Sequence, residues 1–527
     1  MQRFADLLDS LSYQPGRNGK LALIEAYLRA APDPDRGWAL AALTGDLSFR
    51  HAKAGAIRKL IEARTDPVLF RLSYDYVGDL AETAALMWPA RPGANRPPEL
   101  AEVVEGLAAA GRDQVPEMLA GWLDTLDATG RWALLKLVTG GLRVGVSARL
   151  AKTAAAQVGG IDAAEIEELW HALAPPYASL FAWLEGRTPK PDPRVPGGFR
   201  PLMLSHPVGE GDLAALSPAD VAAEWKWDGI RVQAAGERGT LNLYSRTGED
   251  LSGAFPDLAG ALSGIEATLD GELLVMHGGE ARPFNDLQQR LGRKSVSAKL
   301  MREYPVGLRL YDLLIEDGED LRELPFMARR ARLEAWFDRV RPGRADLSPL
   351  VAFSEWAELD ALRSAPPHPV IEGVMLKRRD APYLAGRPKG YWWKWKRDPF
   401  LVDAVLMYAQ RGHGKRSSFY SDFTFGCWTA EGDLVPVGKA YFGFTDAELK
   451  QLDRFVRDNT VARYGPVREV RREPAHGLVL EIAFEGVARS ARHKSGVAMR
   501  FPRVHRIRWD KPPAEADTVA RLEALVP

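Results

Sequence analysis

The stretch Glu224-Trp225-Lys226-Trp227-Asp228-Gly229-Ile230-Arg231 is the most informative segment of this 527-residue chain. Its lysine is followed two places later by Asp-Gly and then by an arginine, as expected around a lysine nucleophile in phosphoryl chemistry. A free lysine has a pKa of roughly 10.4, so burial or neighbouring cations must lower the pKa of Lys226 before its amine can attack. Alone, the stretch is equally consistent with an exposed lysine before an Asp-Gly turn, a pattern expected by chance in roughly one chain in ten of this length.

Further motifs follow this stretch in a fixed order. They are Asp270-Gly271-Glu272, Glu372-Gly373-Val374-Met375-Leu376-Lys377, Trp392-Trp393-Lys394-Trp395-Lys396, and finally Arg500-Phe501-Pro502-Arg503 with Arg506, Arg508, Asp510 and Lys511. The ordered set resembles the covalent nucleotidyltransferases, the superfamily of DNA ligases, RNA ligases and mRNA capping enzymes. Within that superfamily it is similar to ATP-dependent DNA ligases of the bacterial type that carry a helical N-terminal DNA-binding domain. The resemblance spans residues 224–511.

Length and composition agree with a globular protein of about three domains. Hydrophobic residues make up 46% and charged residues 27%, which are ordinary values. The single cysteine, Cys427, excludes a disulfide framework and the four-cysteine zinc module of NAD-dependent ligases. The sequence shows no signal peptide and no apolar run long enough to span a membrane, so we expect a cytoplasmic protein without membrane contact.

The pattern of residues divides the chain into three domains and a linker. Residues 1–186 show helical spacing of apolar side chains and predict an all-α domain. Residues 187–201 contain five prolines and two adjacent glycines, which is typical of a linker. Alternating strands with intervening helices over 202–400 predict an α+β or mixed α/β fold, matching the nucleotidyltransferase (adenylation) domain. Short strands and frequent turns over 401–527 suit a small β-barrel, which the resemblance identifies as an OB-fold.

Net charge is zero, but basic residues gather near the C-terminus. Such residues could simply form a basic face exposed to solvent. Contact with a polyanion is the favoured interpretation, because apolar residues alternate with the arginines, namely Phe501, Val504, Ile507 and Trp509. That alternation predicts a half-buried strand with one basic face. The basic residues of 486–511, which face one acid, are Arg489, Arg492, Lys494, Arg500, Arg503, Arg506, Arg508 and Lys511.

A Gly-rich turn over residues 140–147 precedes a predicted helix in the N-terminal domain. Free backbone N–H groups at such a turn can bind a phosphate, although simple helix punctuation is the interpretation that the residues alone favour. The ligase DNA-binding domain has a similar Leu-Arg-Val/Ile-Gly-Val-Ser element. The resemblance therefore implies that Arg143, Gly145 and Ser147 contact the DNA backbone.

The resemblance also implies a role for each residue around the nucleotide. Lys226 attacks the α-phosphate of ATP and becomes lysyl-AMP. Lys394 and Lys396, which share a face if 392–396 is a strand, neutralise that phosphate and lower the pKa of Lys226; the alternative is an exposed Trp/Lys strand edge. The residues that remain are Glu224 for the adenine amino group, Tyr311 (commonly phenylalanine) for stacking, Arg231 and Glu272 for the ribose, and Glu372 with Glu272 for Mg²⁺, which Mn²⁺ can replace.

Two further phosphate sites are implied. Arg246, within Tyr244-Ser245-Arg246-Thr247-Gly248-Glu249, would grip the 5′-phosphate of a nick. Arg503 and Lys511 would hold the departing pyrophosphate, with Arg500 and Arg506 beside them. Because this last motif belongs to a separate domain, the family's OB-fold closes over ATP and then swings away to face DNA.

We therefore predict an ATP-dependent DNA ligase that seals nicks in duplex DNA through lysyl-AMP and a DNA-adenylate. The resemblance implies a nucleoid-associated monomer that clamps around DNA during replication, repair or recombination. An RNA ligase or mRNA-capping-type nucleotidyltransferase is the alternative, since both share the catalytic motifs. A non-catalytic DNA-binding scaffold is disfavoured because every expected catalytic position holds a suitable residue.

Overall fold

A computed structural model describes residues 1–89, 96–192, 195–293, 295–411, 420–441, 444–490 and 493–526. Two residues of the predicted linker, 193 and 194, and Arg492 of the basic run lie outside these ranges. The chain divides into two compact units, one formed by Met1–Ala151 and Pro399–Pro527 and the other by Lys152–Asp398. In the part of the chain that is described, no helix has the length and apolar character needed to cross a membrane.

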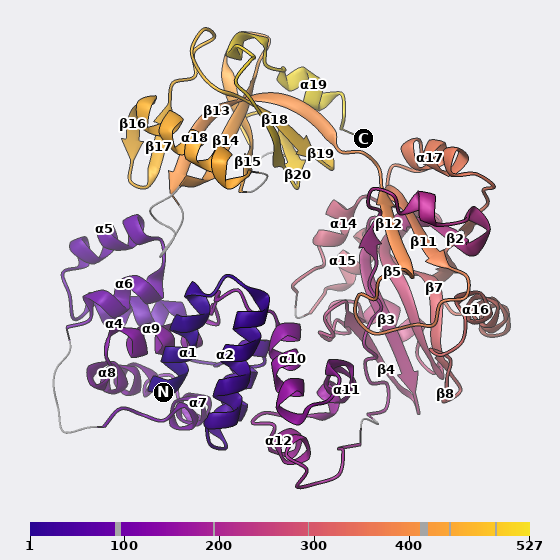
Figure 1. Cartoon of the computed structure of the whole chain (residues 1–527), viewed down its shortest axis with the longest axis horizontal. Helices are drawn as coiled ribbons and strands as arrows, with labels where there is room; N and C mark the ends of the chain where they lie inside the picture. Colours follow the sequence, from indigo (N-terminus) through magenta and orange to yellow (C-terminus); the bar gives the residue numbers. More distant parts are fainter. Residues whose placement is uncertain are drawn as a thin grey trace. The chain divides into compact units, whose positions relative to one another are not determined.

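The N-terminal region is helical, as the spacing of its apolar residues predicts (Figure 1). Phe4, Leu8 and Leu11 on α1 are fully buried, and α9 packs against both α1 and α6. The helices are α1 (Gln2–Tyr13), α2 (Arg17–Ala30), α3 (Asp35–Thr44), α4 (Ala54–Glu62), α5 (Pro67–Val77), α6 (Leu80–Met87), α7 (Leu100–Ala109), α8 (Val115–Thr125), α9 (Ala128–Thr139), α10 (Ala148–Gly159), α11 (Ala163–Leu169) and α12 (Ala178–Leu184). Helix α10 contains the boundary between the two units, and α11 and α12 belong with Lys152–Asp398.

The unit Lys152–Asp398 is built on two sheets, with strand orders β1-β12-β11-β2-β10 and β4-β3-β5-β7-β8. Most neighbouring strands are antiparallel, whereas β1 with β12 and β7 with β9 are parallel. Helix α16 (Phe326–Val340) packs on β7, and α17 (Trp356–Ser364) packs on β11. The strands of these sheets include β1 (His206–Pro207), β2 (Val221–Trp227), β3 (Ile230–Glu237), β4 (Thr240–Ser245), β5 (Ala267–His277), β7 (Val306–Glu316), β8 (Glu319–Asp320), β9 (Ala345–Leu347), β10 (Leu350–Val351), β11 (Ile371–Arg378) and β12 (Trp392–Lys396).

The turn Asp228-Gly229 carries the chain from one sheet to the other, because β2 and β3 lie on either side of it. A Cβ atom at Gly229 would lie 2.4 Å from the carbonyl oxygen of Leu273 and 2.9 Å from Cγ of Glu272. Only glycine therefore allows this turn to approach β5 so closely. The Asp-Gly pair in the motif thus brings the end of the Lys226 strand against the strand that carries Glu272.

The C-terminal strand region, Pro399–Val526, is rich in short strands as predicted. Its longest strand, β13 (Phe400–Arg411), pairs with β14, β17 and β18, and β18 pairs in turn with β21. The other elements are β14 (Tyr420–Trp428), β15 (Leu434–Ala440), α18 (Asp446–Asp458), β16 (Thr460–Tyr464), β17 (Val467–Val470), β18 (Val479–Phe484), β19 (Gly486–Arg489), β20 (Val497–Arg500), β21 (Arg503–Arg508) and α19 (Val519–Glu523).

Five arginines of the basic run lie on three of these strands, Arg489 on β19, Arg500 on β20, and Arg503, Arg506 and Arg508 on β21. Val504 and Ile507 are both buried on β21, although they are three positions apart, because the pairing with β18 shifts register between them. Phe501 and Trp509 lie outside this strand and are 58% and 51% exposed, so they do not continue its buried face. The predicted half-buried strand is therefore shorter than the alternation suggests.

Candidate active site

Lys226 lies in a row that crosses three neighbouring strands. Gly373 of β11 is paired with Lys226 of β2 on one side and with Lys396 of β12 on the other. Gly373 has φ +147°, and a Cβ atom there would lie 2.3 Å from the carbonyl oxygen of Trp395. The glycine of this Glu-Gly motif thus lets the β12 backbone come close to β11, which places Lys396 near Glu372.

One carboxylate joins the two lysines of this row. The Oε2 atom of Glu372 lies 2.7 Å from Nζ of Lys226 and 3.4 Å from Nζ of Lys396. Burial acts to raise the pKa of Glu372, but the two ammonium groups outweigh it and hold that pKa below its ordinary value. Lys226, the predicted nucleophile, therefore forms an ion pair with Glu372, the carboxylate predicted to bind a metal.

Glu272 of β5 is a second carboxylate beside Lys226. Burial raises the pKa of Glu272 to about 7, the positive charges of Lys226 and Arg231 oppose that rise, and the negative charge of Glu372 adds to it. Among the described residues no group of three or more His, Cys, Asp or Glu side chains gathers to hold a metal ion. Two carboxylates do fit magnesium in a nucleotide enzyme, because substrate phosphates supply the remaining oxygens.

Glu224, predicted to bind the adenine amino group, is buried and already paired with two cations. Its carboxylate lies 2.5 Å from Nζ of Lys377 and 3.2 Å from Nη1 of Arg330. Burial raises the pKa of Glu224, and Lys377 opposes the rise more strongly than Arg330 does. Nζ of Lys377 also lies 4.6 Å from the ring centroid of Tyr311, the predicted stacking residue.

Lys377 therefore connects the predicted adenine-binding residues, although no role was predicted for it. It is the last residue of the Glu372–Lys377 motif, and that position is the signal that could have identified it. Its ammonium lies 4.6 Å from the ring centroids of Phe326 and Trp392 as well, so it occupies an aromatic enclosure beside Glu224.

Arg231, predicted to contact the ribose, donates four hydrogen bonds to other residues of the protein. Its guanidinium donates to both carboxylate oxygens of Asp270, to the carbonyl oxygen of Met203 and to the hydroxyl of Tyr383. These bonds use four of its five N–H donors. The group lies 5.8 Å from the ring centroid of Tyr311, next to the predicted base site. Ribose contact by Arg231 stays a prediction.

Arg246 and Lys394 belong to a group of like charges. Burial lowers the pKa of Lys394, and Arg387, Lys396, Lys226 and Arg246 lower it further. Burial also lowers the pKa of Arg246, together with the positive charges of Arg231 and Arg387. Clustered cations of this kind are typical of an anion site. Arg387 was not predicted, because it lies in a stretch between two motifs.

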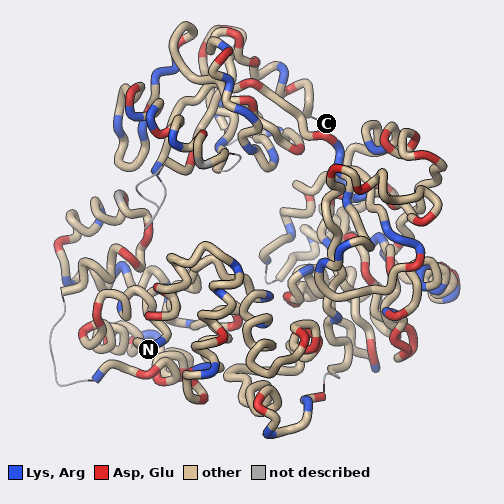
Figure 2. The backbone as a smooth tube through the Cα atoms, viewed as in Figure 1, with Lys and Arg blue, Asp and Glu red and all other residues tan. Residues whose placement is uncertain are grey.

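The predicted pyrophosphate residues are paired with acids of their own region. Nζ of Lys511 donates to Asp403 at 2.7 Å, and Arg508 reaches the same carboxylate oxygen at 3.2 Å. Arg503 lies 3.6 Å from Glu485. In addition, Arg506 lies 3.3 Å from Glu481. Figure 2 shows the resulting mixture of basic and acidic positions in this region, where the sequence predicts one basic face.

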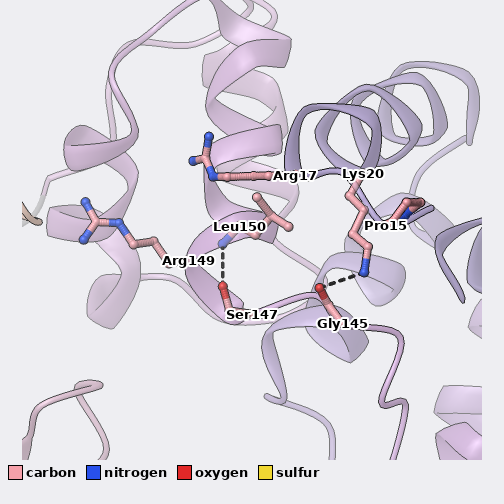
Figure 3. Close-up of a pocket in the computed structure, with 7 residues that line it drawn as sticks. All are labelled: Pro15, Arg17, Lys20, Gly145, Ser147, Arg149 and Leu150. Atoms are coloured by element: carbon pink, nitrogen blue, oxygen red, sulfur yellow. Dashed lines mark hydrogen bonds between the residues drawn. The ribbon is translucent and has the colours of Figure 1, made fainter. Parts of the chain in front are cut away.

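The predicted DNA-contacting element lies beside a small pocket in the helical region (Figure 3). Ser147 caps α10, since its Oγ accepts a hydrogen bond from the backbone N–H of Leu150. Nζ of Lys20 on α2 donates to the carbonyl oxygens of Val144 and Gly145, at 2.7 and 3.0 Å. The seven described residues that line the pocket, among them three cations and no acid, are Pro15, Arg17, Lys20, Gly145, Ser147, Arg149 and Leu150.

The structure thus brings Gly145 and Ser147 together with Arg17 and Arg149, two arginines for which no role was predicted. Arg143 is exposed and has φ +46°, but it does not line this pocket. The signal that could have found Arg17 is its place at the first position of α2, next to Gly16.

Comparison with protein families matches two segments of the chain. Residues 203–396 match the family described as ATP dependent DNA ligase domain, and residues 416–511 match the ATP dependent DNA ligase C terminal region.

Comparison with curated proteins gives similar relatives. A probable DNA ligase of Koribacter versatilis is 36% identical over 417 residues, which cover 74% of this chain and 71% of that protein. A probable DNA ligase of Anaeromyxobacter sp. is 34% identical, with coverage of 79% and 80%. A third, of Opitutus terrae, is 29% identical and matches 99% of this chain but 62% of its own length.

A solved structure named Pmar-Lig_Pre. shares the fold of this chain. It has a TM-score of 0.59 and 15% sequence identity, and the match covers 96% of this chain and 99% of that one. At this identity the likeness concerns the fold alone.

Proposed function

Because the chain belongs to the ATP-dependent DNA ligases, we propose that it seals nicks in duplex DNA through a lysyl-AMP intermediate on Lys226. The observation that carries this proposal is the contact of one carboxylate, Glu372, with two lysines, the nucleophile Lys226 and the neighbouring Lys396. Family membership indicates that the nucleotide is ATP. The site geometry supports Nζ of Lys226 as the atom that accepts AMP.

In the first step the Nζ atom of Lys226 attacks the α-phosphorus of ATP. A nitrogen–phosphorus bond forms, the bond to the bridging oxygen of pyrophosphate breaks, and Lys226 must first have lost a proton. Nζ of Lys226 lies 2.7 Å from the carboxylate of Glu372, so nucleophilic attack requires that this ion pair be broken. Lys394 and Lys396 then stabilise the negative charge on the α-phosphate.

Glu372 and Glu272 are the residues that would hold magnesium. Both are carboxylates next to Lys226, which is the hard-oxygen donor set that this ion prefers. When bound, the ion offsets the negative charge of the phosphates. The carboxylate of Glu372, which would serve the metal, is also the ion-pair partner of Lys226.

The buried group around Glu224 would recognise the base. Tyr311 offers a ring for stacking, and Glu224 can accept a hydrogen bond from the adenine amino group while Lys377 and Arg330 neutralise its charge. Arg231 and Glu272 lie beside this group and would face the ribose.

Arg246 would hold the nick for the second and third steps. Its guanidinium takes the 5′-phosphate, with Lys394 and the neighbouring Arg387 adding positive charge. A phosphate oxygen attacks the phosphorus of lysyl-AMP and releases Lys226, which gives the DNA-adenylate. The 3′-hydroxyl then attacks the 5′-phosphate and expels AMP.

We further propose that residues 401–527 form an OB-fold that closes over ATP and then turns to DNA, as in the family. Arg503 and Lys511 would then exchange their acidic partners for the pyrophosphate, and Arg508 would join them because it shares Asp403 with Lys511. Residues 1–186, carrying Arg143, Gly145 and Ser147, would hold the duplex so that a monomer clamps around it. Between these two domains we propose a linker at 187–201 and an adenylation domain at 202–400. We also propose that the protein is cytoplasmic and associated with the nucleoid.

The test follows labelled AMP from nucleotide to DNA. Wild type and Lys226→Ala are incubated with magnesium and either α-³²P-ATP or α-³²P-GTP, and nicked duplex is then added. We expect protein label from ATP only that survives alkali and is released by acid, as a nitrogen–phosphorus bond is, no label on Lys226→Ala, and transfer of the label through DNA-adenylate to free AMP as the nick is sealed. Label taken from GTP, or sealing of RNA strands in preference to DNA strands, would favour a capping enzyme or RNA ligase instead.

A further inference from the structure

The turn that carries Arg246 rests on a histidine from a distant part of the sequence. The ring centroid of His171 lies 5.2 Å from that of Tyr244 and 5.1 Å from that of Phe199, and those two rings lie 5.6 Å apart. Tyr244 is the second-last residue of β4, two places before Arg246. A Cβ atom at Gly248 would lie 2.8 Å from Nε2 of His171, so the backbone of the turn touches the edge of the imidazole ring.

The turn itself is held by short-range hydrogen bonds. Oγ of Ser245 accepts from the backbone N–H groups of Thr247 and Glu249, and the N–H of Gly248 donates to the carbonyl oxygen of Ser245. These bonds fix the shape of the turn, but they involve only its own residues. Contacts from outside determine where the turn lies relative to the sheet, and His171 supplies one at each end, at Tyr244 and at Gly248.

His171 belongs to the helical segment α11–α12, between the helix Ala163–Leu169 and the helix Ala178–Leu184. This segment has a second attachment to the same unit. Glu168 of α11 forms an ion pair with Arg322 at 2.7 Å, and Arg322 follows strand β8. The attachment at Glu168 does not involve the Arg246 turn, so the two attachments can be separated by mutation.

We propose that His171 is a positioning residue for Arg246, by which the helical segment sets the place of the guanidinium that grips the 5′-phosphate of the nick. This inference rests on the proposed role of Arg246. It predicts that loss of the ring displaces the turn and weakens AMP transfer to DNA. Formation of lysyl-AMP should be spared, because that step uses Lys226 and ATP without the nick.

The experiment measures the two steps separately in His171→Ala, in the matched control Glu168→Ala, and in Arg246→Ala. Lysyl-AMP formation without DNA reports whether each variant is folded. Single-turnover transfer of AMP from purified enzyme-adenylate to nicked duplex reports the use of Arg246. We expect His171→Ala to slow transfer roughly 10- to 100-fold, the cost of misplacing a reacting group by about an ångström. Glu168→Ala should transfer at nearly the wild-type rate.

Two further variants separate positioning from general damage. His171→Phe keeps an aromatic ring between Phe199 and Tyr244 and should recover most of the transfer rate. His171→Ala should cost nothing more when Arg246 is already alanine, because residues that act as a unit are not additive.

Other results would overturn the inference. Equal losses in His171→Ala and Glu168→Ala, or a loss that adds to that of Arg246→Ala, would make His171 a docking residue only. If Arg246→Ala itself transfers AMP normally, the proposed role of Arg246 fails and the inference fails with it. If Arg246→Ala is impaired while His171→Ala is not, the role of Arg246 stands and only the positioning by His171 is wrong.

Discussion

Burial makes Glu272 a carboxyl that changes charge near neutral pH. Its pKa is raised to about 7 in the folded chain, whereas an unfolded glutamate has a pKa of about 4.3. Between these values the folded chain binds a proton that the unfolded chain has released. Stability therefore falls as the pH rises through this window and levels off above it.

Glu272→Gln removes this penalty, because glutamine has the shape of the protonated acid and carries no charge. We expect the variant to melt at a higher temperature than wild type at pH 8, and the two melting temperatures to converge near pH 5. Melting curves in EDTA across this range test the prediction, with Glu280→Gln on the exposed strand end as control. A difference that does not change with pH would contradict it.

At the level of single residues, the sequence predicted which side chains would lie close together better than it predicted their ion-pair partners. Lys226, Glu372 and Lys396 could be predicted to converge, because strand alternation and the motif resemblance point the same way, and the structure brings them together. The pairing of Glu224 with Lys377 could not be predicted, since it depends on which strands become neighbours. Arg387 has no motif around it, and only the folded loop brings it near Lys394.

Among the elements, the turn between β2 and β3 has little room for a larger side chain at Gly229. Gly229→Ala would place a Cβ atom 2.4 Å from the carbonyl oxygen of Leu273, so the turn must move away from β5. We expect a loss of about 1–3 kcal/mol in the free energy of unfolding, as for other overpacked sites. Lysyl-AMP formation should fall as well, because Lys226 and Glu272 lie on the two strands that separate.

Urea unfolding and a labelled-ATP assay together test this prediction. Gly260→Ala is the matched control, because a Cβ atom at Gly260 meets nothing within 4 Å in helix α13 (Pro256–Ala261). If both variants lost equal stability, the close approach at Gly229 would not be the cause.

The types of element were predictable where a periodic pattern was long, and less so where it was short. Helices form in 1–186, and strands β3, β4, β5 and β7 lie where alternating residues predict strands. The basic alternation near the C-terminus was misleading about length, because Phe501 and Trp509 fit a period of two and yet lie outside β21 on the surface. A pattern of polar and aromatic residues cannot distinguish a buried ring from one exposed at a turn.

For the whole molecule, the proposed division of labour assigns Lys511 to the first step only. Lys511→Ala should slow lysyl-AMP formation roughly 100-fold, because a cation that stabilises the leaving pyrophosphate is lost. Sealing of a nick that already carries AMP should proceed at the wild-type rate. Single-turnover assays of the two steps test this, with Lys450→Ala of α18 as control. Equal loss in both steps would contradict the assignment.

If the pocket in the helical region binds a DNA phosphate, its arginines should contribute to the salt dependence of DNA binding. Arg17→Ala and Arg149→Ala should each reduce the slope of log Kd against log salt by about one, as expected when one phosphate contact is lost. Binding of nicked duplex at several salt concentrations measures the slope. Lys59→Ala, an exposed cation of α4, serves as control. A slope that falls equally in the control would show that the pocket is not a specific contact.

The domain plan could be predicted in outline, since composition and the proline-rich stretch mark the parts. Its boundaries at 186 and 400 stay predictions. The compact units divide instead at 151 and 399, because α11 and α12 pack with the sheets through Glu168 and His171. Contacts between segments far apart in sequence decide such boundaries, and single-sequence patterns do not contain them.

The acidic partners of the C-terminal arginines and Lys511 have a consequence for release of the product. A new contact of Arg503, Arg506, Arg508 or Lys511 with a DNA phosphate replaces an existing ion pair with Asp403, Glu481 or Glu485. Intact duplex therefore gains little from touching this surface, although it is rich in arginine. A sealed strand should dissociate readily, which leaves the enzyme available for the next break instead of stored along undamaged DNA.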